Sequence, residues 1–335
     1  MDLALLIEWT VKSVIIVLTL LGGFAYLTLF ERRVVARMQT RIGPNRAGPW
    51  GLLQPVADGI KLIFKEELIP DGADRVLFIL APIITVVPSL IILAVLPIGT
   101  QVNLFGRTIA LSLADGINVG LLYVLAVASI AVYGIVIAGW SSNNKYALLG
   151  GMRSSAQMVS YELALGLSVV GPVLLANSLS MREIVLAQRP LWFVFLQPVG
   201  FLIFLISAVA EVNRSPFDMP EAEQELTAGY HVEYSGLKFA LFFMAEYIKM
   251  IAVSAIAATL FLGGYVGPFV DRLPLLGPIY LFLKVLALLF FMVWIRATLP
   301  RLRYDRLMAF GWKVMLPVSL LNVVATGVLV VLLGR

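Results

Sequence analysis

The chain has 335 residues, of which 60% are hydrophobic and 13% are charged, and its formal net charge is +5. The charged share is about half the roughly 25% that is usual in soluble domains, so a water-soluble globular protein is excluded. The basic residues lie in short loops between apolar runs, which is typical of membrane topology and argues against nucleic-acid binding.

An apolar run of about 20 residues is long enough to cross a hydrocarbon core roughly 30 Å thick. Eight segments meet this requirement: 10–30, 76–97, 117–139, 155–177, 191–210, 240–262, 280–298 and 314–333. We expect the first to be retained as a transmembrane helix, because no basic residues precede it as they would in a signal peptide. The pattern predicts an all-α integral membrane protein in which residues 1–335 form a single transmembrane domain with about eight spanning helices.

The distribution of lysine and arginine predicts the orientation. The odd-numbered loops between the eight segments hold most of these residues, so the positive-inside rule places them in the cytoplasm and both termini on the outer side. Two of these loops stand out. Residues 31–75 form a long cytoplasmic loop, and residues 211–239 form an acidic one.

The loop 31–75 contains a second kind of helical pattern. Within 51–66, Leu52, Val56, Ile60 and Phe64 recur every four residues with polar residues between them. This spacing predicts an interfacial amphipathic helix, docked on lipid, on protein or on both. Before it, Arg41-Ile-Gly-Pro-Asn-Arg46 is a turn-rich basic segment, which a contact with anionic lipid would also explain.

Two acidic residues lie inside predicted spans. Ionisable side chains at membrane depth are costly and usually line a cavity or a relay, so Glu162 and Glu246 are candidate functional residues. A protonated Glu162 that bonds to a neighbouring helix is the structural alternative. For Glu246 the alternative is local neutralisation by Lys249, three residues along the same helix.

Further acids follow the fifth span. Glu211 closes that span and opens a segment in which Glu221, Glu223 and Glu225 are closely spaced. Acids in the first turn of a helix complement its dipole, which is a structural explanation. However, Glu221 and Glu225 share one helix face, and crowded carboxylates are suited to holding and passing protons.

The chain lacks the residues for redox chemistry of its own. It has no cysteine and one histidine, so it has no thiolates for an iron–sulfur cluster and cannot bind a haem through two histidines. We expect His231 to be a surface residue and no metal site to be present. Residue patterns alone indicate that the protein handles protons or ions near the cytoplasmic leaflet, and they do not identify its substrate.

Long stretches of the sequence resemble the ND1/NuoH family, the quinone-site membrane subunit of respiratory complex I, the NADH:quinone oxidoreductase. The matching stretches run from Glu31 to Asp58, from Ser142 to Glu162, from Glu211 to Gly236 and from Arg296 to Arg306. The resemblance extends over essentially the whole chain with family-like spacing.

The resemblance implies a role in quinone reduction (ubiquinone or menaquinone) and proton transport in the respiratory chain of a prokaryotic cell membrane. The residues implied for the quinone chamber are Glu31, Arg32, Arg41, Arg46, Asp58, Glu211, Arg214 and Arg296. Those implied for a proton or charge relay are Glu162, Glu211, Glu221, Glu223 and Glu246. The chain would bind quinone as substrate and no cofactor of its own.

The partners implied are the hydrophilic quinone-site and iron–sulfur subunits, the small membrane subunits and the antiporter-like subunits. NADH, FMN and the iron–sulfur clusters would belong to those partners. Two other interpretations stay open at this point: the related membrane subunit of a proton-pumping hydrogenase or another donor-fed relative, and a stand-alone ion transporter. The absence of an internal repeat argues against the transporter.

Overall fold

The computed structural model describes residues 3–104, 107–114, 116–219 and 229–332. Its elements, in chain order, are α1 (Leu3–Met38), η1 (Pro49–Gly51), α2 (Gln54–Ile63), α3 (Arg75–Ile91), η2 (Ile92–Val95), β1 (Gln101–Leu104), β2 (Arg107–Ala110), α4 (Gly120–Ser141), α5 (Lys145–Ala176), α6 (Met181–Ala187), α7 (Phe193–Leu196), α8 (Pro198–Glu211), η3 (Gly229–His231), α10 (Gly236–Phe261), α11 (Leu276–Thr298), α12 (Tyr304–Phe310), η4 (Gly311–Met315) and α13 (Leu316–Leu332). The first three η elements are 3₁₀ turns, and η4 is a π-helical turn that joins α12 to α13.

Within the described ranges, seven helices are long and apolar enough to cross a membrane. The predicted span 191–210 differs from these, because it is divided into α7 and the 14-residue helix α8. The break falls at Gln197, and Pro198 begins α8 because it has no backbone N–H to continue the preceding helix. The prediction of an all-α membrane protein is confirmed, and the described residues include seven long helices and one short apolar helix.

Polar side chains define the ends of two long helices. Asp74 accepts hydrogen bonds from the backbone N–H groups of Val76 and Leu77 and so caps α3. Asn144 caps α5 by accepting from the N–H of Tyr146. Helix α5 ends where Asn177 adopts a left-handed conformation with φ of 51°. The boundaries are therefore set by short polar residues next to otherwise apolar runs.

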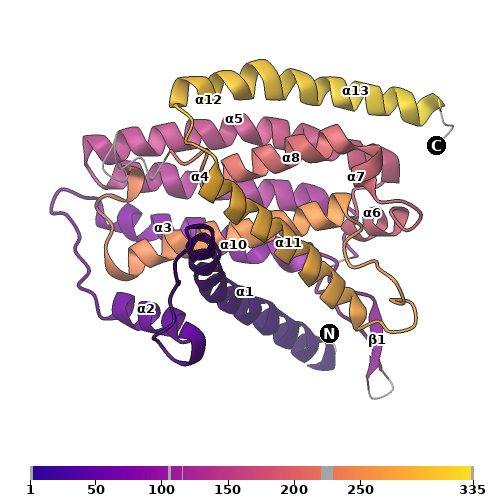
Figure 1. Ribbon diagram of the computed structural model, residues 1–335, viewed down its shortest axis with the longest axis horizontal. Coiled ribbons are helices and arrows are strands. Elements are labelled where there is room, and N and C mark those ends of the chain that lie inside the picture. Colours follow the sequence, from indigo (N-terminus) through magenta and orange to yellow (C-terminus); the bar gives the residue numbers. More distant parts are fainter. Residues whose placement is uncertain (1–2, 105–106, 115, 220–228, 333–335) are drawn as a thin grey trace.

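Helices α3, α4, α5, α8 and α10 are stacked roughly side by side, while α1 and α11 cross the front of this layer obliquely and α13 lies along its outer edge (Figure 1). Glycine allows the closest approaches. A Cβ on Gly134 would clash with the Thr85 hydroxyl oxygen, and one on Gly139 would lie 2.7 Å from the Ala147 carbonyl oxygen. Small residues at such positions let membrane helices pack backbone to backbone.

The two ends of this helical layer differ. A two-stranded antiparallel hairpin, β1–β2, pairs Gln101 with Ala110 and Leu104 with Arg107. It lies at the end of the molecule away from α2, and the N- and C-termini lie toward that same end (Figure 1). The sequence analysis did not predict the hairpin, because strands of four residues in a loop leave little periodic signal.

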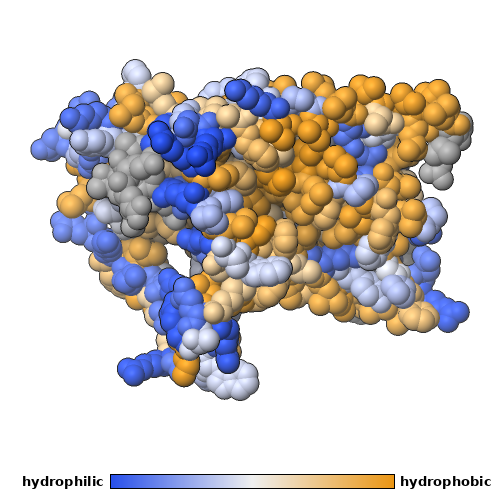
Figure 2. Space-filling model, turned by 45° about the horizontal axis from the view of Figure 1, so that its top comes forward, coloured by the Kyte–Doolittle hydropathy of each residue, from blue (hydrophilic) through white to orange (hydrophobic). Residues whose placement is uncertain are grey.

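The polarity of the surface also differs between parts of the molecule. Hydrophobic residues cover the flank of the helical layer, and hydrophilic residues gather at the end that carries α2 and the neighbouring loops (Figure 2). Helix α2 has no buried residue, and Val56 and Ile60 are both more than half exposed. This helix, within the predicted range 51–66, is therefore peripheral to the fold.

Candidate functional site

A cavity of about 680 Å³ lies where α1, α10 and α11 meet beside the turn that follows α1. Its lining is Glu31, Arg32, Val35, Gln39, Arg41, Pro44, Phe243, Tyr247, Arg296 and Ala297. This volume is within the range of small-molecule sites, which combine apolar walls with a few well-placed polar groups. The cavity therefore meets the first physical requirement of a ligand site.

A largely buried cluster of charges adjoins the cavity, and two of its members, Glu31 and Arg296, line it. The guanidinium group of Arg296 donates to the Glu31 carboxylate and pairs with it. Arg214 lies between two carboxylates, with its terminal nitrogens 3.8 Å from Glu31 Oε1 and 3.9 Å from Glu246 Oε2. Buried charges cost several kcal/mol each unless they are paired, so the opposite signs in this cluster compensate one another.

The cluster joins parts of the chain that are far apart in sequence. Glu31 belongs to α1, Arg214 to the segment after α8, Glu246 to α10 and Arg296 to the end of α11. Glu31, Arg214 and Glu246 are only 6%, 5% and 8% exposed. Sequence analysis selected all four residues, and the structure brings them together.

The aromatic ring of Tyr247 connects the cluster with the cavity. The guanidinium carbon of Arg214 lies 4.2 Å from the centroid of this ring, and Tyr247 itself lines the cavity. A cation over an aromatic face is attracted by the ring quadrupole, most strongly where water is excluded. Sequence analysis missed Tyr247, although its place directly after Glu246 in an apolar helix was an available signal.

A second group of charged residues adjoins this cluster. Lys249 of α10 is half-buried and interacts electrostatically with Glu211, Glu246 and Glu162. Glu211 is 7% exposed at the end of α8. Glu162 is half-buried in α5, where its carboxyl group also interacts with the Ser129 hydroxyl. Lys249 thus connects the acids on three helices, whereas the sequence indicated it only as a neighbour of Glu246.

The edge of the cavity carries a more exposed network. Arg32 donates to Asp58 of α2 at 2.8 Å, and Gln54 donates to the other oxygen of the same carboxylate at 3.1 Å. Arg41 donates to Gln39 at 2.8 Å. These contacts link α2 and the turn after α1 to the mouth of the cavity.

The remaining predicted site residues do not take part in the cavity or in the contacts given above. Arg46 is exposed and does not line the cavity. Glu221 and Glu223, together with Glu225, lie outside the described residues.

His231 does not have the surroundings that we expected for it. It is 6% exposed, and its ring packs edge-on against Tyr230 and Phe239 at centroid distances of 4.9 and 5.5 Å. The expectation of a surface residue was wrong, because the aromatic residues of early α10 cover the loop that carries it. Within the described ranges, no group of three or more His, Cys, Asp or Glu residues is placed to hold a metal ion.

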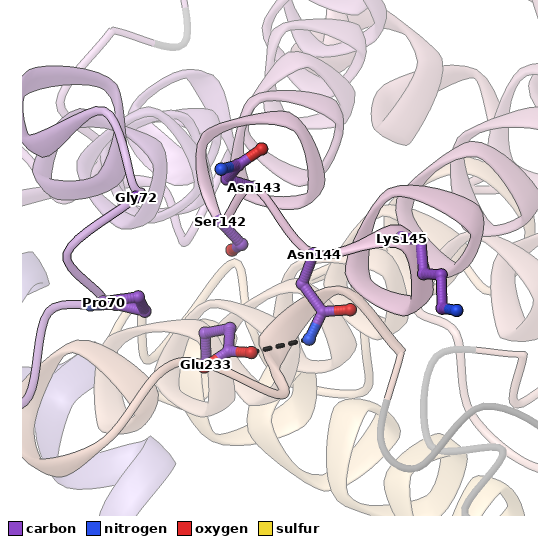
Figure 3. A pocket seen from close by; sticks show the side chains of 7 residues that line it. All are labelled: Pro70, Gly72, Ser142, Asn143, Asn144, Lys145 and Glu233. Carbon is purple, nitrogen blue, oxygen red and sulfur yellow. Dashed lines mark hydrogen bonds between the residues drawn. The ribbon is translucent and has the colours of Figure 1, made fainter.

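A polar pocket of about 550 Å³ lies between loops at the α2 end of the molecule. In it, the Asn144 amide and the Glu233 carboxylate point toward one another across a 2.6 Å hydrogen bond, while Pro70 and Gly72 form the opposite side (Figure 3). This bond ties the α4–α5 turn to the segment before α10. The pocket is open and has no buried charge, so the cavity beside Glu31 is the better candidate site.

The fold and the cavity define a class: a multi-pass membrane protein with a ligand-sized cavity backed by buried, paired charges. A family model described as NADH dehydrogenase matches residues 11–327. The chain is 53% identical to the H subunit of the NADH-quinone oxidoreductase of Thermomicrobium roseum, covering 98% of this chain and 97% of that protein. It is 55% identical to an H subunit, numbered 2, of the NADH-quinone oxidoreductase of Geobacter sulfurreducens, covering 94% of each. The chain belongs to the NADH dehydrogenase (ND1/NuoH) family.

Proposed function

We propose that this chain is the H subunit of a proton-translocating NADH-quinone oxidoreductase. In this role it forms much of the quinone chamber and couples quinone reduction to proton translocation. The observation that carries the proposal is that the cavity and the charge cluster share Glu31 and Arg296, while Tyr247 lines the cavity and packs its ring against Arg214. The names of the relatives support the assignment to this enzyme complex.

The cavity is suited to a quinone. Arg32, Arg41 and Arg296 offer N–H donors to carbonyl oxygens, while Val35 and Phe243 offer apolar surface to the ring and tail. A quinone head group has two such oxygens and a planar apolar ring. The lining therefore matches both parts of the substrate.

Electrons must come from elsewhere, because the chain has no cysteine and only one histidine. We place NADH, FMN and the iron–sulfur clusters in partner subunits. Reduction of a quinone to a quinol takes up two electrons and two protons. A charge change in the cavity acts on Glu31 and Arg296, and a unit charge at about 4 Å in a partly buried site interacts by about 4 kcal/mol.

The coupling follows the contacts of the cluster. Arg214 lies between Glu31 and Glu246, and Lys249 interacts with Glu246, Glu162 and Glu211. Carboxyl groups outnumber cations in this series, so it has capacity to hold a proton. We propose that quinone reduction reprotonates these acids, and that Glu221 and Glu223 extend the relay.

The hydrophilic end of the molecule, with α2, the long loop 31–75 and the loop 211–239, would face the cytoplasm and bind the hydrophilic subunits. The hairpin end and both termini would then face the outside of a prokaryotic plasma membrane. The hydrophobic flank would contact lipid, the small membrane subunits and the antiporter-like subunits. This orientation agrees with the excess of lysine and arginine in the odd-numbered loops.

The experiment is a substitution of Glu162, which lies near Lys249 but does not line the cavity. In membrane vesicles that contain the assembled complex, Glu162→Gln is expected to lower proton pumping at least tenfold, an energetic change of about 1.4 kcal/mol. Inhibitor-sensitive quinone reduction is expected to fall less. The matched control is Asp271→Asn at the hairpin end, where the side chain is 82% exposed and pairs with Arg189.

The two measurements separate the possible outcomes. A Glu162→Gln complex that pumps like the wild type at the same turnover rate would contradict the coupling role. An assembled complex in which changes at Arg296 and Arg214 leave quinone reduction unaltered would contradict the chamber itself.

A further inference from the structure

Gln157 connects the helix that carries Glu162 with the segment that carries Arg214. It lies on α5, is completely buried, and its side-chain nitrogen donates to the Phe217 carbonyl at 2.6 Å and the Ala210 carbonyl at 2.8 Å. The same nitrogen lies 3.2 Å from the Asn213 side-chain oxygen. Three oxygens of one short segment therefore converge on a single amide nitrogen.

These oxygens bracket Arg214 in the sequence. Before it, Asn213 adopts a left-handed conformation with φ of 55°, which turns the chain sharply after α8. After it, the Phe217 N–H donates to the Arg214 carbonyl at 2.9 Å and closes a turn. The Arg214 backbone is thus enclosed by residues that Gln157 holds from α5.

We propose that Gln157 is a positioning residue for Arg214, and through it for the charge cluster beside the cavity; the inference rests on the function proposed above. Gln157 does not line the cavity and acts through the turn that it binds. Arg214 lies between Glu31 and Glu246 at nearly equal distances of 3.8 and 3.9 Å. Coulomb energy varies inversely with distance, so a shift of about 1 Å toward one carboxylate strengthens that interaction by roughly a third and weakens the other by roughly a fifth.

The site requires a hydrogen-bond donor rather than simply a polar residue. An amide NH₂ group supplies two protons to the surrounding oxygens, whereas a carboxylate would place negative charge among them. The amide oxygen of Gln157 is buried and makes no hydrogen bond within the described part of the chain. The side chain is therefore held by its donors alone.

The chain also offers a matched buried glutamine at the opposite end. Gln188 is likewise completely buried, and its amide nitrogen donates to the Thr259 carbonyl at 2.8 Å and the Ile184 carbonyl at 3.2 Å. Its contacts organise the α6–α7 turn and the end of α10, away from the charge cluster. Substitution of Gln188 reports what the loss of a buried amide does to stability alone.

The test compares Gln157→Met with Gln188→Met in the assembled complex in membranes. Gln157→Met is expected to lower the kcat of quinone reduction about tenfold, because two carbonyls of this segment each lose one of their donors and the turn shifts. Gln188→Met is expected to keep kcat within about twofold while the melting temperature falls, as a lost buried hydrogen bond implies. The KM for quinone should change little in either variant.

Two further variants test the donor requirement. Gln157→Glu is expected to recover activity relative to the wild type as pH falls, because a protonated carboxyl group regains one O–H donor. The wild type and the variant share Glu211 and Arg214, so the ratio of their activities isolates residue 157. Asn213→Gly accepts the positive φ without strain but removes one acceptor, and a loss of about twofold to threefold in kcat is expected even where Gln157→Met prevents assembly.

The outcomes are distinct. If Gln157→Met and Gln188→Met lose stability equally and both keep wild-type kcat, Gln157 is structural only and this inference is wrong, while the proposed function is untouched. A pH-independent Gln157→Glu ratio also contradicts the donor role. If Arg214→Met in an assembled complex also keeps wild-type quinone reduction, the proposed function fails together with the inference.

Discussion

The two ends of the helical layer both bury polar side chains, but they do so with different chemistry. Near the hairpin end, Gln197 sits between α7 and α8 and donates to the Thr326 hydroxyl at 2.6 Å, while Asn322 donates to the Gln197 side-chain oxygen at 3.0 Å. Near the α2 end, Arg214 lies 3.8 and 3.9 Å from two carboxylates. The first group is neutral and tightly bonded, whereas the second is charged and its central cation, Arg214, lies farther from its partners.

The difference teaches what each region can do. A neutral network with its donors and acceptors matched stabilises one arrangement of helices and has no reason to respond to a charge nearby. Charges at about 4 Å in a partly buried site keep interactions of several kcal/mol that change when a neighbour gains or loses charge. The hairpin end is therefore suited to holding α13 on the layer, and the α2 end to responding to a nearby change of charge.

The largest effect is expected where the charged region is broken at its centre. Arg214→Met leaves Glu31 and Glu246 buried without their shared cation, and removing one partner of a buried ion pair costs about 3–5 kcal/mol. We expect quinone reduction by the assembled complex to fall at least 100-fold. Arg214→Lys, which keeps the charge without the planar fork, should retain part of the activity.

Equal losses in the two Arg214 variants would contradict the idea that charge, rather than shape, is what the cluster needs. The measurement is inhibitor-sensitive quinone reduction, normalised to the amount of assembled complex.

The α2 end also holds a buried group that stays neutral, the Tyr234 hydroxyl, in contrast to the charged cluster around Arg214. Burial raises the pKa of the Tyr234 hydroxyl to about 12, and this hydroxyl donates to the Phe78 carbonyl. The folded state keeps the proton above pH 10, where an unfolded tyrosine releases it. Stability should therefore fall between about pH 10 and pH 12, by up to about 1.4 kcal/mol per pH unit.

Tyr234→Phe removes the titrating group and should flatten this alkaline loss. The measurement is the melting temperature of the detergent-solubilised protein from pH 8 to pH 12, with wild type and variant side by side. An identical alkaline slope in the two proteins would show that other groups control stability in this range.

The neutral network provides the third prediction. Gln197→Leu removes a donor and an acceptor from the contact between the α7–α8 break and α13, and each buried hydrogen bond that is lost costs about 1–2 kcal/mol. The melting temperature should fall, while the kcat of quinone reduction stays within about twofold of the wild type. A large loss of kcat at unchanged stability would mean that the two ends are not functionally separate.

Much of the fold was accessible from the sequence because apolar length is a direct consequence of membrane thickness. The predicted spans fall on the long helices α1, α3, α4, α5, α10, α11 and the α12–α13 pair. The exception is the predicted span 191–210, which is interrupted at Gln197. Gln197 and the proline after it break the helix, and hydrogen bonds to α13 satisfy the Gln197 side chain at the break. Counting apolar residues does not detect such an interruption.

The site was predicted as a set of residues but not as an arrangement. Glu31 and Arg296 are 265 positions apart, and no local pattern indicates that they pair. Lys249 was interpreted through its nearest acid along the helix, whereas packing also places it near Glu162 and Glu211. Gln157 showed no signal at all, because an amide inside an apolar helix acquires its role only from the oxygens that the end of α8 and the following turn bring to it.

The smallest effect is expected at the exposed edge of the charged region. Arg32 pairs with Asp58 at 2.8 Å, but their side chains are 53% and 25% exposed, so solvent screens the pair and it contributes about 1 kcal/mol or less. Asp58→Asn should raise the KM for quinone by at most about fivefold, leave kcat unchanged, and matter less at high salt because screening is already strong there. Arg189→Gln, which breaks the exposed pair with Asp271 at the other end, should leave KM unchanged. A loss of kcat in Asp58→Asn comparable to that of Arg214→Met would mean that burial is not what distinguishes the central charges from those at the mouth of the cavity.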